Sequence, residues 1–249
     1  MRTIDENTLK SYKNHLYIQE KSKNTIDKYI RDIRTFTVWL QTQEQKDITK
    51  DSAIHYKKHL EAHYKPSSTN SMLTALNGFF EYMGWHDCRV KTLKTQPNHI
   101  YAQEKELTRD EYEKLVTTAE EEGNQRLALL METLGCTGIR VGEIGFITVE
   151  AVKDGKAGIS FKGKHRWIYL VHDLKMKLLD YCKKQNIKSG AVFITKNGNL
   201  LDRSNIWMEM KEIAKKAGVA LEKVFPHNLR HFFARAHYKA HKNISHLAD

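Results

Sequence analysis

The sequence has 249 residues, 40% of them hydrophobic, and it carries a formal net charge of +11 with an isoelectric point near 9.4. This length suits one large domain or two modest ones, and the lack of a long apolar run excludes a membrane-spanning protein. Residues 1–100 carry a net charge of +5 and the remainder +6, so both halves are basic, as expected when both touch one polyanion.

Helical periodicity dominates residues 1–92, which we predict to form the first domain. Apolar side chains recur at helical spacing in four segments of this region. Thr49 or Asp51 is expected to cap the third helix. Four helices with short joints predict a compact helical bundle. The four segments are 6–21, 24–43, 49–64 and 66–85.

The polar, basic stretch 93–106 is typical of a linker, and a second domain is predicted over residues 107–249. Thr108 and Glu111 have the spacing of a capping box. A short helix is expected in "RVGEIGFI", two strands in "AGISFK" and "RWIYLV", and a third short strand in "AVFIT". The predicted fold class is therefore mainly α with a small β-sheet, a helical N-terminal domain being followed by a mixed α/β domain.

The features that report on cellular location indicate the cytoplasm. The first residues, "MRTIDENTLK", lack the apolar core of a secretory signal. The three cysteines, Cys88, Cys136 and Cys182, share no paired spacing and are typical of a reducing compartment. We therefore expect a cytoplasmic protein with no membrane partner.

Two motifs suggest cofactors, and we reject both. "GISFKGK" has the spacing of a phosphate loop, but the next residue is His165, where ATP-binding loops need Ser or Thr to hold magnesium. The pairs His227/His231 and His237/His241 have i, i+4 spacing, yet no acidic residue or cysteine accompanies them as in a zinc site. The sequence predicts neither a metal nor another cofactor.

Four residues from three separate segments are better explained as groups that hold a phosphate. Arg140 follows a glycine-rich turn in "GCTGIRVGEI", where backbone N–H groups and a guanidinium can face one anion, and Glu143 can brace it. Lys162 lies at a strand end in "KGKHRW". "HNLRH" places His227 and Arg230 on one helical face. Together they predict a metal-free phosphate-binding site.

These segments, in this order, resemble the tyrosine recombinase (phage integrase) family. The resemblance rests on "TGIRVGEI", "KGKHR" and "HNLRH", and "KSKNTIDKYIRDIRTFTVWL" and "SSTNSMLTALNGFFEYM" are similar to two helices of the family's core-binding domain. It covers nearly the whole chain and is greatest to simple, two-domain, Xer-like members. It implies a SAM-like core-binding domain, a catalytic domain and a site-specific recombinase or integrase of a mobile genetic element. The implied partner is double-stranded DNA with an inverted-repeat core site.

The resemblance also implies residue roles. Arg140 and Arg230 match the arginines that stabilise the pentacoordinate phosphate, Lys162 the lysine that protonates the leaving 5′-oxygen, and His227 the histidine that assists proton transfer. Glu143 and His231 match supporting residues. The hairpin is one residue shorter than usual, so Lys164 remains a second candidate for the acid. The expected DNA contacts are Lys23, Asn24, Thr25, Ser68, Thr69, Asn70 and Arg166.

The family's nucleophile is a tyrosine that would fall beyond residue 249, and Tyr238 is too near Arg230 to match it. We therefore expect a C-terminally shortened recombinase that binds DNA without cleaving it and assembles poorly into the family's tetramer. A non-catalytic DNA-binding regulator derived from a recombinase is the alternative. A metal-dependent nuclease would need the histidine pairs as ligands. A type IB topoisomerase shares the chemistry but not the core-binding helices.

Overall fold

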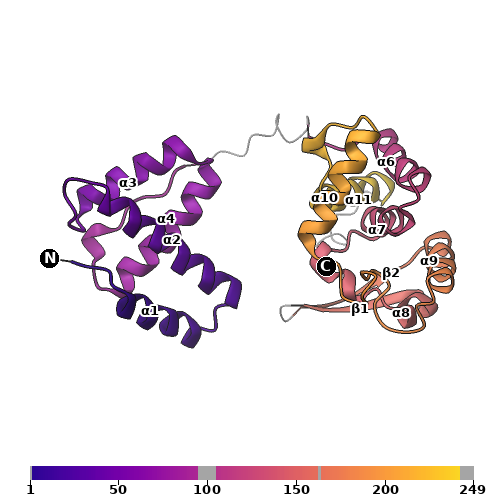
Figure 1. Cartoon of the computed structure of the whole chain (residues 1–249), viewed down its shortest axis with the longest axis horizontal. Coiled ribbons are helices and arrows are strands. Elements are labelled where there is room, and N and C mark those ends of the chain that lie inside the picture. Colours follow the sequence, from indigo (N-terminus) through magenta and orange to yellow (C-terminus); the bar gives the residue numbers. More distant parts are fainter. Residues whose placement is uncertain (1, 95–104, 162–163, 242–249) are drawn as a thin grey trace. The chain divides into compact units, whose positions relative to one another are not determined.

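A computed structural model describes residues 2–94, 105–161 and 164–241, and Figure 1 shows its elements. The chain divides into two units, Met1–Pro97 and Asn98–Asp249. Each unit has its own hydrophobic core. The division falls inside the segment 93–106 that the composition marks as a linker. No helix within the described ranges is both long and apolar enough to cross a membrane.

The first unit is the predicted helical bundle. Thr49, rather than Asp51, caps α3, and Asp5 and Ser22 cap α1 and α2 in the same way. The bundle core is rich in aromatic rings, with Phe36 against Tyr56 and Tyr12 against Phe79. The elements are α1 (Glu6–Ile18), α2 (Lys23–Gln41), α3 (Lys50–His63), α4 (Pro66–Tyr82) and the 3₁₀ turn η1 (His86–Cys88).

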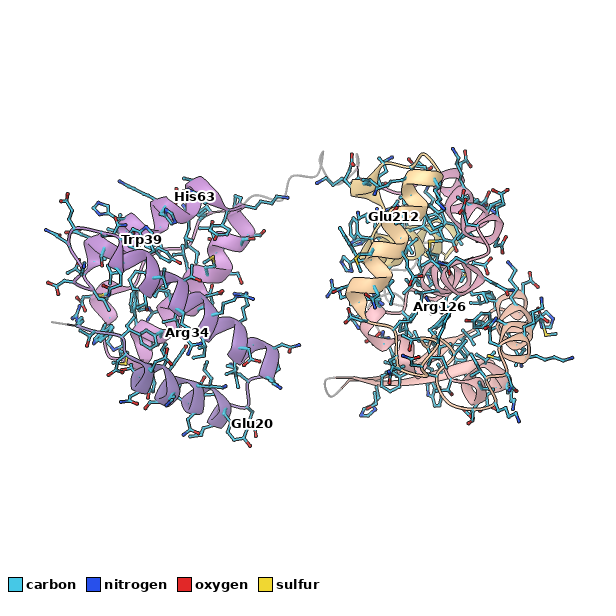
Figure 2. The ribbon with its side chains drawn as sticks, viewed as in Figure 1. Glu20, Arg34, Trp39, His63, Arg126 and Glu212 are labelled. Carbon is cyan, nitrogen blue, oxygen red and sulfur yellow. The ribbon has the colours of Figure 1, made fainter. Side chains whose placement is uncertain are left out.

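The second unit is built around α7, which packs against α6, α9, α10 and α11. The predicted capping box is confirmed, because Thr108 and Glu111 each accept a hydrogen bond from the other's backbone N–H. Arg126, labelled in Figure 2, ties α7 to α10 through a 2.9 Å ion pair with Glu209. The elements that precede the sheet are α6 (Arg109–Glu121), α7 (Gln125–Thr137), the 3₁₀ helix η2 (Val141–Phe146) and α8 (Val149–Asp154).

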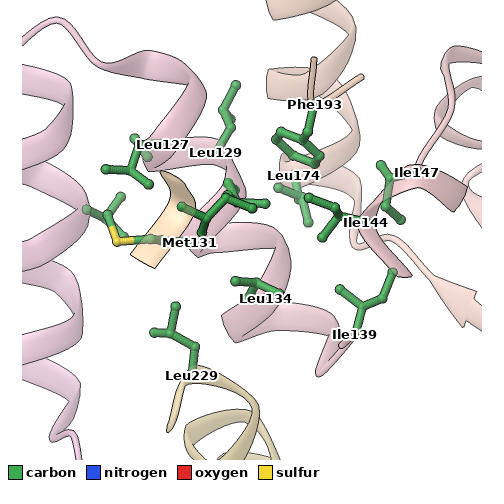
Figure 3. Packing of buried hydrophobic residues seen from close by; sticks show 14 of the residues in the cluster. Leu127, Leu129, Met131, Leu134, Ile139, Ile144, Ile147, Leu174, Phe193 and Leu229 are labelled. Carbon is green, nitrogen blue, oxygen red and sulfur yellow. The ribbon is translucent and has the colours of Figure 1, made fainter. Parts of the chain in front are cut away.

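The remaining elements complete the core around α7. Figure 3 shows Leu134 of α7 packed in one buried cluster with Ile139 and Ile144, which lie in the turn after α7 and in η2. Leu229 of α11 belongs to the same cluster. The core therefore fixes the turn after α7 against α11. The later elements are β1 (Lys156–Phe161), β2 (Lys164–Tyr169), α9 (His172–Lys184), α10 (Arg203–Lys216), η3 (Leu221–Lys223) and α11 (Pro226–His241).

The sheet of the described residues is a two-stranded antiparallel hairpin, in which Ile159 pairs with Arg166. The predicted third strand at 191–195 is wrong, because this segment makes only isolated bridges, Thr148 with Ala191 and Ile194 with Leu200. Its apolar side chains fill the core instead of lining a ladder, and Phe193 is fully buried. The predicted short helix after Arg140 is present as η2, a 3₁₀ helix.

Candidate phosphate-binding site and nucleic-acid interface

The turn after α7 presents Arg140. α7 ends at Thr137, and Gly138 then adopts a left-handed conformation with φ of 62°, which glycine reaches without steric cost. Two residues later, Arg140 is the N-cap of η2, and its side chain is 52% exposed. The guanidinium of Arg140 is therefore accessible to a ligand, while the backbone from which it extends is held in place by the core.

Glu143 is the buried centre of the site, with a side chain that is 0% exposed. It accepts hydrogen bonds from the backbone N–H of Arg140 at 3.0 Å and from Arg140 Nη1 at 3.1 Å. From β2, Arg166 Nη2 donates to Glu143 Oε2 at 2.5 Å, and Nη1 donates to Oε1 at 3.3 Å. One carboxylate thus holds two guanidinium groups from different elements, as a bidentate acceptor does well.

The pKa of Glu143 reflects a competition between burial and these partners. Burial alone raises the pKa of a carboxyl because it penalises the charged form. The hydrogen bonds from Arg166 and from the backbone and side chain of Arg140 outweigh burial, and the net pKa lies below the ordinary value of 4.5. Glu143 is therefore a carboxylate at neutral pH.

Arg230 enters from the first turns of α11 and contacts the turn after α7. Its Nη1 donates to the backbone carbonyl of Gly138. Three residues further along α11, the ring of Phe233 lies so close to Gly138 that a Cβ there would overlap it. A glycine at this position is therefore required twice, by its φ and by the packing of Phe233.

We call the group formed by Arg140, Glu143, Arg166 and Arg230 the guanidinium cluster. The pKa of Arg230 is lowered, first by burial and then by repulsion from Arg140 and Arg166, with Glu143 acting in the opposite direction. Three guanidinium groups around one carboxylate leave an excess of two positive charges. Such an excess, held partly out of water, favours a bound anion.

His227 and His231 lie on the exposed side of α11 next to the cluster. Their rings meet edge to face, with centroids 4.4 Å apart. Burial lowers the pKa of His231 below its ordinary 6.5, and repulsion from His227, Arg235 and Arg230 lowers it further, against an opposing effect of Glu106. His231 is therefore neutral at pH 7 and able to exchange a proton.

Two lysines, Lys162 and Lys164, were predicted as candidates for the general acid. Lys162 falls outside the described residues. Lys164 opens β2 and pairs with Phe161 across the hairpin. In the described part of the second unit, the structure brings Arg140, Glu143 and Arg230 together as the sequence indicated. It adds Arg166, expected as a DNA contact, whose side chain is 12% exposed and engaged with Glu143.

Of the DNA contacts expected in the first unit, some are accessible and one is wrong. Lys23, Asn24 and Ser68 are exposed. Thr69 is 0% exposed and its hydroxyl donates to the carbonyl of Leu60, so it cannot reach DNA. The reason is helical phase, because Thr69 precedes the buried Leu73 and Leu76 by four and seven residues.

Two further first-unit predictions have mixed placements. Thr25 is half-buried at the start of α2, where its backbone N–H donates to Ser22. The carboxamide of Asn70 is used internally: it donates to the carbonyl of Leu93 at 3.0 Å and accepts from the N–H of Leu93 at 2.7 Å. Asn70 therefore binds the chain that leaves the first unit.

A hollow of about 630 Å³ between α2 and the start of α4 adds residues that the sequence analysis missed. The missed residues are Lys28 and Arg31 of α2 and Ser67 and Ser71 of α4, which line it together with the predicted Ser68. Basic and hydroxyl side chains around a concave surface are typical of phosphate-backbone contacts. The missed signal is the i, i+3 spacing of Lys28 and Arg31, which puts both cations on one side of α2.

Metal-ligating side chains do not converge in the described ranges. No group of three or more His, Cys, Asp or Glu residues lies close enough together there to hold a metal ion. The rings of His227 and His231 contact each other, and Arg230 and Arg235 act on His231 as nearby cations. Repulsion from those cations disfavours a metal and favours an anion at this position.

Comparisons with known proteins agree with this architecture. The model described as "Phage integrase family" matches residues 105–249, and "Phage integrase, N-terminal SAM-like domain" matches residues 9–86. The chain is 29% identical over 238 residues to "Tyrosine recombinase XerA" of Pyrococcus horikoshii, covering 93% of this chain and 79% of that protein. It is 26% identical over 230 residues to "Tyrosine recombinase XerD" of Vibrio cholerae, covering 86% and 76%.

A solved structure shares the fold. The chain superposes on a lambda integrase (75-356) dimer bound to a COC' core site with a TM-score of 0.76 and 22% identity, over 94% of this chain and 90% of the other. The match extends over both units of the chain. The helical first unit and the mixed second unit thus occur together in a protein that was crystallised on DNA.

Proposed function

Because this chain belongs to the phage integrase family, whose tyrosine recombinases are DNA-strand-transferring enzymes, we propose that it binds duplex DNA through both units. The guanidinium cluster then holds the phosphate at which strand transfer occurs. The observation that carries this proposal is the convergence of Arg140, Arg166 and Arg230 around Glu143 with an excess of positive charge. A phosphodiester is negatively charged, so its binding offsets the repulsion between Arg230 and the two arginines that lower its pKa, Arg140 and Arg166.

The cluster suits the transition state of phosphoryl transfer better than the ground state. In the proposed reaction a tyrosine oxygen bonds to phosphorus as the bond to the 5′-oxygen breaks, which leaves a 3′-phosphotyrosyl link. The pentacoordinate phosphorus carries extra negative charge on its oxygens, and planar guanidinium donors match two such oxygens at once. We assign this role to Arg140, the more exposed arginine, and to Arg230.

The remaining site residues have supporting roles in the proposal. Lys162, or Lys164 as the second candidate, gives the proton to the leaving 5′-oxygen, and His227 assists proton transfer or phosphate positioning. His231, neutral at pH 7, lies beside His227. Glu143 and Arg166 position the arginines that touch the phosphate. Removing one charge-stabilising donor from such a site costs about 3–4 kcal/mol of activation free energy.

The nucleophile is a separate question. Tyr238 is the only tyrosine between Arg230 and residue 249. It lies eight residues after Arg230 on α11, about 12 Å along the helix axis at 1.5 Å per residue, and its side chain is 47% exposed. We therefore propose that Tyr238 is not the nucleophile of strand transfer, and that residues 1–249 by themselves bind DNA without forming a covalent link to it.

The first unit supplies the second half of the proposed DNA contact. Lys28, Arg31 and the serines of the α2–α4 hollow would meet backbone phosphates, which position a protein without reading sequence. The lambda integrase structures include a dimer on a core site and a tetramer on a Holliday junction. We propose that copies of this chain likewise bind the two halves of an inverted repeat, and that the protein is cytoplasmic.

Two gels test the proposal. Selection from a pool of random duplexes, followed by a mobility-shift assay, should yield a retained duplex that Arg140→Ala binds more weakly. A denaturing gel with a nicked suicide version of that duplex should show no covalent band for the 249-residue chain. Failure to retain any duplex would contradict the DNA-binding proposal. If a covalent band appeared and persisted in Tyr238→Phe, another residue would be the nucleophile. If the band were lost in that variant, Tyr238 would be the nucleophile.

A further inference from the structure

Asn228, between His227 and Arg230, takes no part in the proposed chemistry, yet it is 5% exposed and fully engaged as a donor. Its Nδ2 donates to the carbonyl of Lys105 at 2.8 Å and to the carbonyl of Lys223 at 2.6 Å. Lys105 lies where the chain enters the second unit, and Lys223 lies in η3. One side chain therefore joins three separate segments at the first turn of α11.

The bonds around Asn228 continue into a network. Lys223 Nζ donates to Glu111 Oε1 at 2.8 Å, and Glu111 Oε2 accepts from the backbone N–H of Thr108 at 2.9 Å. The capping box of α6 is thus connected through Lys223 to Asn228. Because buried donors and acceptors are costly to leave unpaired, breaking one bond of this network weakens the position of the others.

Arg235 adds a second attachment on the same face of α11. It lies seven residues, or two helical turns, after Asn228. Its Nη2 donates to the carbonyl of Leu107 at 2.9 Å, and its Nη1 lies 3.5 Å from Glu106 Oε1. The segment 105–107, which we call the connector exit, is therefore bound to the helix that carries Arg230.

The first unit has a comparable attachment that does not involve the cluster. Asn77 of α4 donates to the carbonyl of Val90 at 2.7 Å and accepts from its N–H at 2.9 Å, and Asn70 binds Leu93 in the same two-way manner. Asn70 and Asn77 are two helical turns apart, about 10.5 Å, which matches three residues of extended chain. Asn77 thus provides a matched control for Asn228.

We propose that Asn228 is a positioning residue for the guanidinium cluster, holding Arg230 at the carbonyl of Gly138 by fixing the first turn of α11 to the connector exit and η3. Arg230 reaches Gly138 from the turn of helix that Asn228 anchors. Without those two bonds, the first turn of α11 loses its side-chain hydrogen bonds to the connector exit and to η3. The inference rests on the proposed function only in that Arg230 contacts the DNA phosphate.

The test is Asn228→Leu, which keeps the number and branching of the side-chain heavy atoms and removes both donors without adding a charge. The matched control is Asn77→Leu, which makes the same change on α4. The readout is the exchange of the Arg230 guanidinium protons with water, followed by NMR in the 249-residue chain without DNA. Asn228→Leu should accelerate this exchange about tenfold, as expected when hydrogen bonds of ordinary strength are lost. Asn77→Leu should leave it unchanged.

Two results would overturn the inference. Equal acceleration in both variants would mean that Arg230 responds to any loss of stability. An unchanged Arg230 signal, together with faster amide exchange at Leu107, would mean that the connector exit is released without moving the cluster. Should Asn228→Leu fail to fold, Lys223→Met loosens the same network from its far side, and a smaller acceleration is expected. No DNA enters this measurement, so its outcome is independent of the DNA-binding test.

Discussion

Asp32 in the first unit and Glu143 in the second are both buried carboxylates with two cationic partners, but they are built differently. Asp32 pairs with Lys28 and Arg31, which are neighbours on the same helix with side chains 33% and 72% exposed. Glu143 pairs with Arg140 and with Arg166, which arrives from β2 and is mostly buried. The first arrangement holds two exposed cations on one helix, whereas the second holds guanidinium groups from different elements at one carboxylate.

The difference matters because a surface that binds backbone phosphates tolerates movement, whereas stabilising a transition state needs fixed donors. Exposed cations that lose their partner are rehydrated, and such pairs contribute little. A buried cation that loses its partner stays desolvated, and breaking such a pair is costly. Equivalent substitutions in the two units should therefore have unequal effects.

The largest difference is expected between Glu143→Ala and Asp32→Ala. Glu143→Ala leaves Arg166 buried and unpaired, and should lower the free energy of unfolding of the second unit by about 3–5 kcal/mol. Asp32→Ala leaves Lys28 and Arg31 in contact with water and should cost clearly less. Denaturant unfolding followed by amide exchange in each core measures both values. Equal losses would contradict the distinction between the two carboxylates.

A glycine pair sharpens the account of the turn that presents Arg140. Gly138→Ala and Gly123→Ala both place a side chain at positive φ, 62° and 71°, but a Cβ at Gly123 meets open space. The left-handed conformation alone costs roughly 1–2 kcal/mol, and overlap with Phe233 should add about 1–3 kcal/mol at Gly138 only. Thermal unfolding of both variants measures the difference. A Gly138→Ala protein as stable as Gly123→Ala would show that Phe233 moves aside freely.

Acid should weaken the second unit through Glu143 and Glu111, whose pKa values both lie below the ordinary 4.5. For Glu111, burial raises the pKa, but the hydrogen bonds from Lys223 and Thr108 lower it by more than burial raises it. The same balance holds for Glu143. A depressed folded-state pKa contributes stability above the unfolded pKa and loses it as pH falls through the folded value. The urea concentration at the midpoint of unfolding of the second unit should therefore decrease as the pH is lowered below 4.5. Glu143→Gln should flatten this dependence, and an unchanged slope would contradict the assignment.

The smallest effect is expected on the first unit's hollow. Arg31→Ala should weaken binding to every duplex alike and reduce the slope of log K against log salt by about 0.9, the value for one phosphate contact. Lys46→Ala, in the loop beyond the opposite end of α2, removes the same charge and should leave the slope unchanged. Mobility shifts over a series of salt concentrations measure both. Equal slopes for the two variants would show that the hollow does not contact DNA phosphates.

The sequence indicated the parts of the site that are local. Arg140 with Glu143, and His227 with Arg230, are spaced three residues apart, so helical geometry alone puts each pair on one side. The bond from Arg166 to Glu143 and the overlap of Phe233 with Gly138 join segments 23 and 95 residues apart. Such contacts depend on how α7, β2 and α11 pack, which no spacing reveals.

Other differences arose where local chemistry was considered without burial. Thr69 was expected among the DNA contacts, but the stripe that it shares with Leu73 faces the core. The segment 191–195 has strand composition, but Phe193 is drawn into the core and the ladder is limited to single bridges. In both cases the deciding factor was which side of the chain the core covers.

The central claim is that one DNA phosphate is held by the guanidinium cluster. The most direct test combines neutral methylphosphonates, placed singly along the selected duplex, with the Arg140→Ala variant. At one phosphate, neutralisation should weaken binding of the unmodified chain but add no further loss in Arg140→Ala, because both changes remove the same contact. Losses that add at every phosphate would contradict the claim, since Arg140 would then contact none of them.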